Sequence, residues 1–184
     1  MYTFKRAETP DELDQLFRLN HAVFAEELKQ YEPGGDPRLV DKFHSKNRYW
    51  IAVAGGIVVG MVSLHDQPPF SVASRLADPG ILEPLGRIAE VRLLAIAPGH
   101  RNGMVLTGLL LVMFDDRGSL YDTLAVSGYV AEQKLYHALG FRDLGPPVRS
   151  GEAEYIPMSV AVPALAQRAG RWRERMRKYA AQGR

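Results

Sequence analysis

A glutamate interrupts the apolar run in the segment RIAEVRLLAIAP, which spans residues 87–98. An unpaired carboxylate is costly to bury, so Glu90 should be paired or functional. Desolvation would raise its pKa toward the range of a general base. Arg92 falls two residues further along the same strand face, so an ion pair between Glu90 and Arg92 at a sheet edge is the alternative interpretation.

The next stretch, APGHRNGMVLTGLLLVMF (residues 97–114), passes from an apolar run through a polar turn into a segment of helical length. The free backbone N–H groups at the start of such a helix favour an anion, above all a pyrophosphate. Gly99 and Gly103 would let the backbone approach a ligand closely, and His100 and Arg101 add hydrogen-bond donors. The alternative is an ordinary strand-to-helix turn that binds nothing.

A third candidate is Tyr136, in the segment AEQKLYHALGF (residues 131–141), which reads as a helix ended by Gly140. A phenol can donate a proton to a group that develops negative charge during a reaction. The alternative is a helix tyrosine that packs beside Leu135 and Leu139.

Other chemistries lack sequence support. The chain has no cysteine, which excludes disulfides, thiolate metal sites and a cysteine nucleophile. Its five histidines show no paired spacing typical of metal ligands, so no metal is expected. The sequence contains no phosphate-binding G-x-x-x-x-G-K-[ST] loop, no G-x-G-x-x-G fingerprint and no G-x-S-x-G nucleophile elbow.

Charge is distributed unevenly along the chain. Residues 168–184 hold seven basic side chains and one acid, whereas the whole chain has a net charge of only +2. Such a tail suits an acidic partner, although a solvated helix face is the alternative. A nucleic-acid partner is not expected, because no aromatic platform is interleaved with the basic residues. No secretory leader and no apolar run of about 18 residues is visible, so a cytoplasmic protein is expected.

The elements that position these residues follow from periodicity and turn signals. Strands are predicted at residues 2–7, 49–53, 57–64, 88–97, 120–126, from 141 and at 155–162. Helices are predicted at residues 9–31, 37–44, 103–117, 130–139 and from 163. This order predicts an α/β fold with a mixed sheet flanked by helices: a domain at residues 1–162 and a basic, amphipathic C-terminal helix at 163–184. The proline-rich segment 66–86 is predicted to be a long loop with one helical turn, and such loops are often functional.

The segments around the turn and around Tyr136 resemble two signatures of the GNAT acyltransferase superfamily. The resemblance implies a GNAT-like sheet and acetyl-coenzyme A, or a longer acyl-coenzyme A, as co-substrate. Tyr136 would then protonate the departing thiolate. The implied coenzyme-binding residues are Leu94, Ala95 and Ile96 for the pantetheine arm, and His100, Arg101, Asn102, Gly103, Met104 and Val105 for the pyrophosphate.

The segments HAVFAEELKQYEP and DKFHSKNRYW, with EVR on the later strand, are similar to one GNAT branch. That branch includes acyl-homoserine lactone synthases and N-acyl amino acid synthases. The matching residues are Val23, Phe24, Glu27, Leu28 and Glu90, with Asp41 as a further candidate. The similarity implies an acyl donor carried on coenzyme A or on acyl carrier protein. Because carrier proteins are acidic, the basic tail would be their docking face.

The function predicted from these features is an N-acyltransferase in which a small-molecule amine attacks the thioester directly. Glu90 and Tyr136 are its predicted catalytic residues, and Tyr31, Phe70 and Arg92 its predicted substrate-binding residues. Tyr31 would line the substrate mouth at the end of the first helix, and Phe70 would cover it from the long loop together with Arg75. The alternative is a catalytically silent module that binds an acyl thioester or mediates assembly, and a homodimer is one arrangement that the sequence allows.

Overall fold

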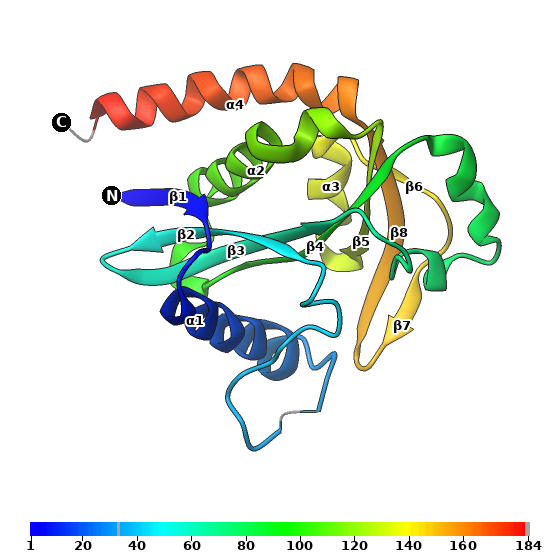
Figure 1. Cartoon of the computed structure of the whole chain (residues 1–184), viewed down its shortest axis with the longest axis horizontal. Coiled ribbons are helices and arrows are strands. Elements are labelled where there is room, and N and C mark those ends of the chain that lie inside the picture. The colour runs from blue at the N-terminus through cyan, green and yellow to red at the C-terminus, as the bar shows by residue number, and fades with distance from the viewer. Residues whose placement is uncertain (33, 183–184) are drawn as a thin grey trace.

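The computed structural model describes residues 1–32 and 34–182 and contains one mixed eight-stranded sheet. The strand order is β1-β2-β3-β4-β5-β8-β6, with β7 paired to β8 (Figure 1). β4 and β5 are parallel, and the other pairs are antiparallel. The strands are β1 (Tyr2–Arg6), β2 (Arg48–Ala54), β3 (Ile57–His65), β4 (Ile88–Ile96), β5 (Thr123–Tyr129), β6 (Arg142–Asp143), β7 (Val148–Ser150) and β8 (Ala153–Ala161). The predicted α/β fold is confirmed.

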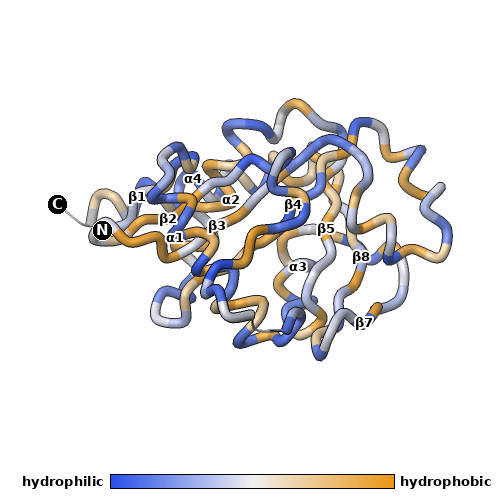
Figure 2. The backbone as a smooth tube through the Cα atoms, turned by 60° about the horizontal axis from the view of Figure 1, so that its bottom comes forward, coloured by the Kyte–Doolittle hydropathy of each residue, from blue (hydrophilic) through white to orange (hydrophobic). Residues whose placement is uncertain are grey.

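Helices cover both faces of this sheet (Figure 1). Helix α1 (Pro10–His21) packs on one face, where Leu16 and Leu19 join a core cluster with β2 and β3. Helices α2 (Gly103–Arg117), α3 (Gln133–Leu139) and α4 (Val162–Gln182) contribute to the larger core cluster on the other face. Long hydrophobic stretches of the strands lie between these two layers (Figure 2).

The first helix is shorter than the predicted 9–31. It begins with a capping box, in which the Thr9 hydroxyl accepts from the Glu12 backbone and the Glu12 carboxylate accepts from Thr9. It then widens into a π-helical turn at Ala22–Glu27. The turn ends where the Leu28 N–H donates to the Val23 carbonyl and Lys29 takes a left-handed φ of 48°. This reversal ends the helix before Tyr31.

The helix predicted at residues 37–44 is wrong, since this segment consists of bends and turns. The Asp36 and Asp41 carboxylates accept from the backbone N–H groups of Arg38 and Phe43. Short acidic side chains that bond to the local backbone in this way compete with helix formation.

Two other element boundaries differ from the prediction. Strand β5 begins at Thr123 rather than at residue 120. The segment 66–86 holds two 3-10 turns, Ala73–Arg75 and Pro79–Leu85.

The sheet opens between its two parallel strands. The pairing of β4 with β5 ends at Val91 and Val126, although both strands continue. In the same region the register of β3 and β4 shifts by one residue, and Leu93 has a φ of 51°. A bulge of this kind bends a strand and redirects its neighbours. The backbone of β4 after Val91 therefore leaves the β5 ladder and borders a gap in the sheet.

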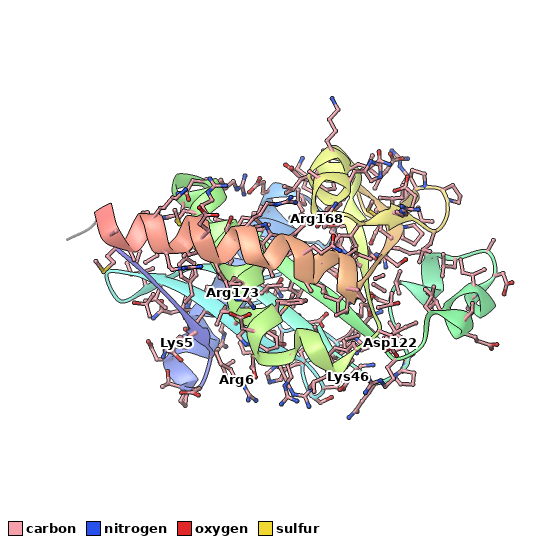
Figure 3. All side chains as sticks on the ribbon, turned by 90° about the horizontal axis from the view of Figure 1, so that it is seen from above. Lys5, Arg6, Lys46, Asp122, Arg168 and Arg173 are labelled. Carbon is pink, nitrogen blue, oxygen red and sulfur yellow. The ribbon has the colours of Figure 1, made fainter. Side chains whose placement is uncertain are left out.

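Helix α4 lies along α2 on the outside of the molecule (Figures 1 and 3). Its side chains tie it to the other helices. Arg168 donates to the Ala138 carbonyl at the end of α3, and Arg173 pairs with Asp115 of α2. Tyr179 stacks on Tyr2 of β1 at a centroid distance of 6.5 Å. Within the described residues, no helix is long and apolar enough to span a membrane.

Candidate active site

A cavity of about 830 Å³ lies at the opening between β4 and β5. Its walls come from both faces of the sheet. Val23 and Phe24 line it from the α1 side, and Leu110 and Leu135 line it from the α2 and α3 side. A single cavity therefore crosses the sheet at the point where the parallel strands part.

The part of the cavity on the α2 side, which we call the apolar arm, is enclosed by hydrocarbon. Its residues come from α2, β5, α3, the segment directly after α3, and α4, and they carry no charge: Leu106, Leu110, Met113, Leu124, Val126, Leu135, Leu139, Phe141, Leu165 and Trp172. Such a lining favours an extended apolar ligand, because the hydrophobic contribution grows with the buried area.

The part on the α1 side, which we call the polar arm, has a different chemistry. It is lined by side chains from the segment after α1, the 66–86 loop, β4 and the β7–β8 hairpin: Gln30, Tyr31, Lys42, Ser71, Ser74, Arg75, Glu90, Arg92, Arg149 and Tyr155. Four of these are cationic and one is anionic. Over the whole cavity lining, which also includes Arg101, Glu27 and Glu132, cations still outnumber anions by five to three, so the polar arm favours an anionic ligand.

Glu90 lies at the centre of a hydrogen-bond network and is fully buried. One carboxylate oxygen accepts from the Ser71 hydroxyl at 2.6 Å and from the Val72 backbone N–H at 2.7 Å. The other accepts from the Ser71 backbone N–H at 2.7 Å and contacts His65 Nε2 at 3.1 Å. These four bonds fill the acceptor positions that a carboxylate offers.

The predicted rise in the pKa of Glu90 is wrong. Burial by itself would raise it, but the hydrogen bonds from His65 and Ser71 and the nearby Arg92 guanidinium outweigh burial and hold the pKa of Glu90 below its ordinary value. Glu90 is therefore ionised at neutral pH. Whether Glu90 takes part in catalysis stays a prediction.

Arg92 joins Glu90 to the segment after α1. Its guanidinium donates to Asp41 Oδ1 at 2.8 Å, contacts the Ser71 hydroxyl and lies 3.8 Å from Glu90 Oε1. It also lies over the Phe43 ring, 4.7 Å from its centroid. The ion pair between Glu90 and Arg92 is thus present, but in the interior and not at a sheet edge. Asp41 is the stronger partner of Arg92 by distance.

Arg75 stands out because its charge has no anionic partner within the described ranges. Its Nη1 donates to the Ser71 carbonyl at 3.3 Å, its guanidinium lies 5.2 Å from the Tyr155 ring centroid, and its Nε is buried without a partner. Burial and the neighbouring Arg92 lower the pKa of the Arg75 guanidinium, although an arginine stays charged at neutral pH. A half-buried cation without a counter-charge is costly, so the polar arm is suited to a ligand that supplies one.

Tyr136 lies on α3 and lines the cavity between its two arms. Its ring packs edge-on against Phe141 and lies against Gly128 of β5, where a side chain would not fit. Burial, with a smaller effect from Glu132, raises the pKa of Tyr136 to about 12. The phenol is therefore protonated at neutral pH, as a proton donor must be. Tyr129 and Tyr155 also line the cavity.

The turn after β4 differs in detail from a preformed pyrophosphate site. The Asn102 side chain caps α2, and its Oδ1 accepts from the N–H groups of Met104 and Val105 at 3.0 Å each. His100 contacts the Tyr2 hydroxyl through Nδ1 at 3.0 Å, and Arg101 forms a two-pronged pair with Glu27. Of the predicted pyrophosphate residues, Arg101, Asn102 and Gly103 line the cavity, whereas His100 and Met104 are absent from its lining and Val105 is buried in the core.

Gly103, the first residue of α2, lies under a cation from α4. A side-chain carbon built on Gly103 would be only 2.7 Å from Nη2 of Arg175. Arg175 itself is exposed. The N-terminal end of α2 and a guanidinium therefore face the same space, and both favour negative charge.

The remaining predicted residues fall into two groups. Leu94, Ala95, Ile96 and Tyr31 line the cavity, and the Tyr31 side chain is partly exposed to solvent. Phe70 does not: it stacks on His65 at 5.5 Å and lines a second cavity of about 600 Å³ near Tyr121.

Sequence reasoning missed Ser71, Tyr155 and the apolar lining of α4, and it placed Arg75 only in a covering loop. The carboxylate within the apolar run predicted that Glu90 has buried partners, but the sequence could not show which residues these are. In the described part of the chain, no cluster of three or more potential metal ligands occurs.

No family model and no curated protein matches this sequence. Solved structures do match. A CoA-dependent acyl-homoserine lactone synthase, BjaI, solved with MTA, has a TM-score of 0.70 and 22% identity, covering 92% of this chain and 90% of its own. FeeM, an N-acyl amino acid synthase from uncultured soil microbes, has a TM-score of 0.70 and 16% identity, covering 89% and 92%. An acyl-CoA N-acyltransferase from Pseudomonas aeruginosa has a TM-score of 0.59 and 18% identity, covering 86% and 97%.

These similarities establish the fold. The chain is built like acyl-homoserine lactone synthases, N-acyl amino acid synthases and N-acyltransferases over nearly its whole length. The resemblance to the GNAT branch that contains those enzymes is thereby confirmed at the level of the fold.

Proposed function

We propose that the protein transfers an acyl group from an acyl thioester to the amine of a small molecule that also carries an anionic group. The observation that carries this proposal is the single cavity at the β4–β5 opening, with an apolar arm on one side and a cationic arm on the other. A thioester held where the two arms meet would place its acyl chain in hydrocarbon and its carbonyl within reach of an amine in the polar arm.

The apolar arm supports an acyl group longer than acetyl. An acetyl group would leave most of the apolar arm without ligand contacts, whereas each buried methylene contributes about 0.8 kcal/mol. The backbone of Leu94 to Ile96, released from the β5 ladder, would hydrogen-bond the pantetheine arm and polarise the thioester carbonyl. Gly103 and Arg175 would face the coenzyme phosphates.

Tyr136 is the proposed proton donor. When the neutral amine nitrogen attacks the thioester carbonyl, a carbon–nitrogen bond forms and the carbon–sulfur bond breaks; the nitrogen gives up one proton to solvent and the thiolate takes one from Tyr136. A protonated phenol on the wall between the arms fits this step, and its raised pKa keeps it protonated until the thiolate forms.

Arg75 is the proposed binding residue for the anionic group of the acceptor. The polar arm is lined by unpaired Arg75, by Lys42 and by Arg149, so a carboxylate there would supply the missing counter-charge. An arginine favours a carboxylate because its N–H groups match the two oxygens. An amino acid is the simplest molecule that offers both an amine and a carboxylate.

Glu90 acts indirectly in this proposal. With its acceptor positions filled, the carboxylate anchors Ser71 and Arg92 and offsets part of the positive charge of the polar arm. To act directly as the base that removes the ammonium proton, Glu90 would have to give up one of these hydrogen bonds and accept one from the amine instead. The stability and the turnover of a Glu90→Gln variant separate the two roles.

One observation favours the alternative, a module that binds an acyl thioester without catalysis. The Asn102 cap already occupies two N–H groups of the cradle, so coenzyme binding must displace that side chain or rely on the groups that remain.

Acyl-coenzyme A donors of increasing chain length, incubated with a pool of amino acids, separate the two functions. Release of free thiol with formation of an N-acyl amino acid is expected. Parallel reactions use the corresponding amines without a carboxylate. Equal turnover of both acceptor sets would contradict the anionic acceptor, and binding without thiol release would favour the silent module.

Acyl carrier protein is the second proposed form of the donor. The carrier is acidic, so it would bind to the exposed basic side chains of α4 and deliver its acyl group to the same cavity. Decanoyl groups offered on coenzyme A and on carrier protein at equal concentration would show which donor supports the faster turnover.

A further inference from the structure

Helix α4 does more than cover the outside of the fold. Leu165, Ala169 and Trp172 recur at intervals of four and three residues, so they lie on one face of the helix, and this face is directed at the core. Leu165 and Trp172 also line the cavity. The helix is therefore a wall of the apolar arm, opposite the floor that Leu124 and Val126 of β5 provide.

The apolar arm has an open end and a closed end. Along α2 the cavity is lined by Gly103 and then by Leu106, Leu110 and Met113 of the apolar arm, which together cover about 15 Å at 1.5 Å per residue. Gly103 is exposed and Leu106 is half-buried, whereas Leu110 is 7% and Met113 only 2% exposed. Burial increases along α2, so the apolar arm closes toward Met113.

Along α4, side-chain burial increases from the C-terminal part toward the N-terminal part, which is the opposite sequence direction to α2. Arg175 lies against Gly103 and Trp172 is half-buried near the open end, while Leu165 is 4% exposed. Two helical turns separate Leu165 from Trp172, about 10 Å. Leu165 is thus at the closed end, together with Met113 and with Leu124, which is fully buried.

We infer that Leu165 of α4 sets the longest acyl chain that the protein accepts, because its side chain closes the apolar arm. This inference rests on the proposed function, whose donor occupies the apolar arm. Leu124 lies in the central sheet, where a change of size would disturb strand packing. Leu165 lies on an outer helix that packs on α2, so a change in its size alters the length of the apolar arm at lower cost to the fold.

The test compares Leu165→Val and Leu165→Phe with the wild type, using coenzyme A esters from acetyl to dodecanoyl. Both thermal stabilisation by each ester and thiol release with the amino acid pool are measured. Leu165→Val should move the preferred chain to a longer one, and Leu165→Phe to a shorter one. A methylene in a hydrophobic pocket changes discrimination by about 10- to 200-fold, so a change of about tenfold in the ratio between neighbouring esters is expected.

Leu19→Val and Leu19→Phe are the matched controls. Leu19 is similarly buried, but it lies on α1 in the core cluster of the other sheet face and does not line the cavity. These changes should cost similar stability and leave the chain-length preference as in the wild type. Melting temperatures without ligand show that each variant is folded.

The two readouts separate this inference from the proposed function. A preference that moves in opposite directions in the two Leu165 variants supports the inference, even if only binding and no thiol release is seen. Thiol release with an unchanged preference in both variants would overturn the inference and leave the proposed function intact. If no acyl thioester of any length, on coenzyme A or on acyl carrier protein, stabilises the wild type, both are overturned.

Discussion

Ser71 donates two hydrogen bonds to Glu90, one from its backbone N–H at 2.7 Å and one from its hydroxyl at 2.6 Å. Nineteen residues separate the pair in the sequence. Through this contact the proline-rich loop is fastened to β4 beside the cavity, and the loop in turn presents Arg75 to the polar arm. The arrangement of the polar arm thus depends on one buried carboxylate.

The first prediction concerns the Glu90→Gln variant. The glutamine amide has an NH2 group in place of one carboxylate oxygen, so N–H donors that now bond to that oxygen would face another donor. The variant should therefore lose about 1–3 kcal/mol in free energy of unfolding. Denaturant unfolding measures this loss. Glu83→Gln, at an exposed position of the same loop, is the control and should be neutral. A variant of native stability whose turnover falls by about 10²–10⁴-fold would instead identify Glu90 as the direct base.

Acid stability should depend on the same carboxylate. Because the pKa of Glu90 is lower in the folded state than its ordinary value of about 4.3, the ionised form stabilises the fold at neutral pH. This contribution is complete above about pH 4.3 and is lost as the pH falls through the lower, folded-state pKa. The difference in unfolding free energy between the wild type and Glu90→Gln should therefore shrink below pH 4.3. A difference that stays constant across the acid range would contradict the shifted pKa.

Arg75→Met should separate binding from stability. Removing a half-buried cation that lacks an anionic partner among the described residues should leave the free energy of unfolding unchanged or increase it. The same change should raise KM for a carboxylated acceptor by about 10- to 100-fold, since a charged hydrogen bond contributes about 1.5–3 kcal/mol. Arg149→Met is the comparison, because Arg149 lines the cavity but lies near Glu154. Steady-state kinetics with an unchanged KM for Arg75→Met would remove Arg75 from acceptor binding.

Tyr136→Phe tests the proton donor. The variant keeps the ring that packs on Phe141 and loses only the hydroxyl, so its fold and its affinity for the acyl thioester should be preserved. Turnover should fall by about 10²-fold or more, the usual contribution of a positioned acid. Tyr129→Phe, which changes a neighbouring lining tyrosine, serves as the control. Native turnover in Tyr136→Phe would exclude the hydroxyl from the reaction.

Gly103→Val examines the cradle. A side chain at Gly103 meets only the flexible end of Arg175, so the protein should fold, but the backbone approach to a phosphate would be blocked. Coenzyme A affinity, measured by calorimetry, should fall by about tenfold or more, because each lost charge-assisted hydrogen bond costs about 1.5–3 kcal/mol. Gly99→Ala adds a side chain in open space in the same turn and should bind normally. Normal binding by Gly103→Val would mean that the turn holds no phosphate.

The sequence by itself determined the local features of this protein. Periodicity predicted the strands around Glu90 and the helix after Gly103, and the Thr9-Pro10 start of the first helix follows from capping chemistry between near neighbours. These elements depend on residues a few positions apart. The motifs around Gly103 and Tyr136 were also local, and they pointed to the right fold.

Only the tertiary structure decided how the site is arranged. The pKa of Glu90 depends on His65 and Ser71, 25 and 19 residues away, and the pairing of Arg92 depends on Asp41, 51 residues away. The separation of β4 from β5 and the wall that α4 adds to the apolar arm also arise from contacts between distant segments. Burial predicts the cost of placing a charge in the interior, but only the folded chain reveals which donors offset that cost for Glu90, and that Arg75 has no anionic partner among the described residues.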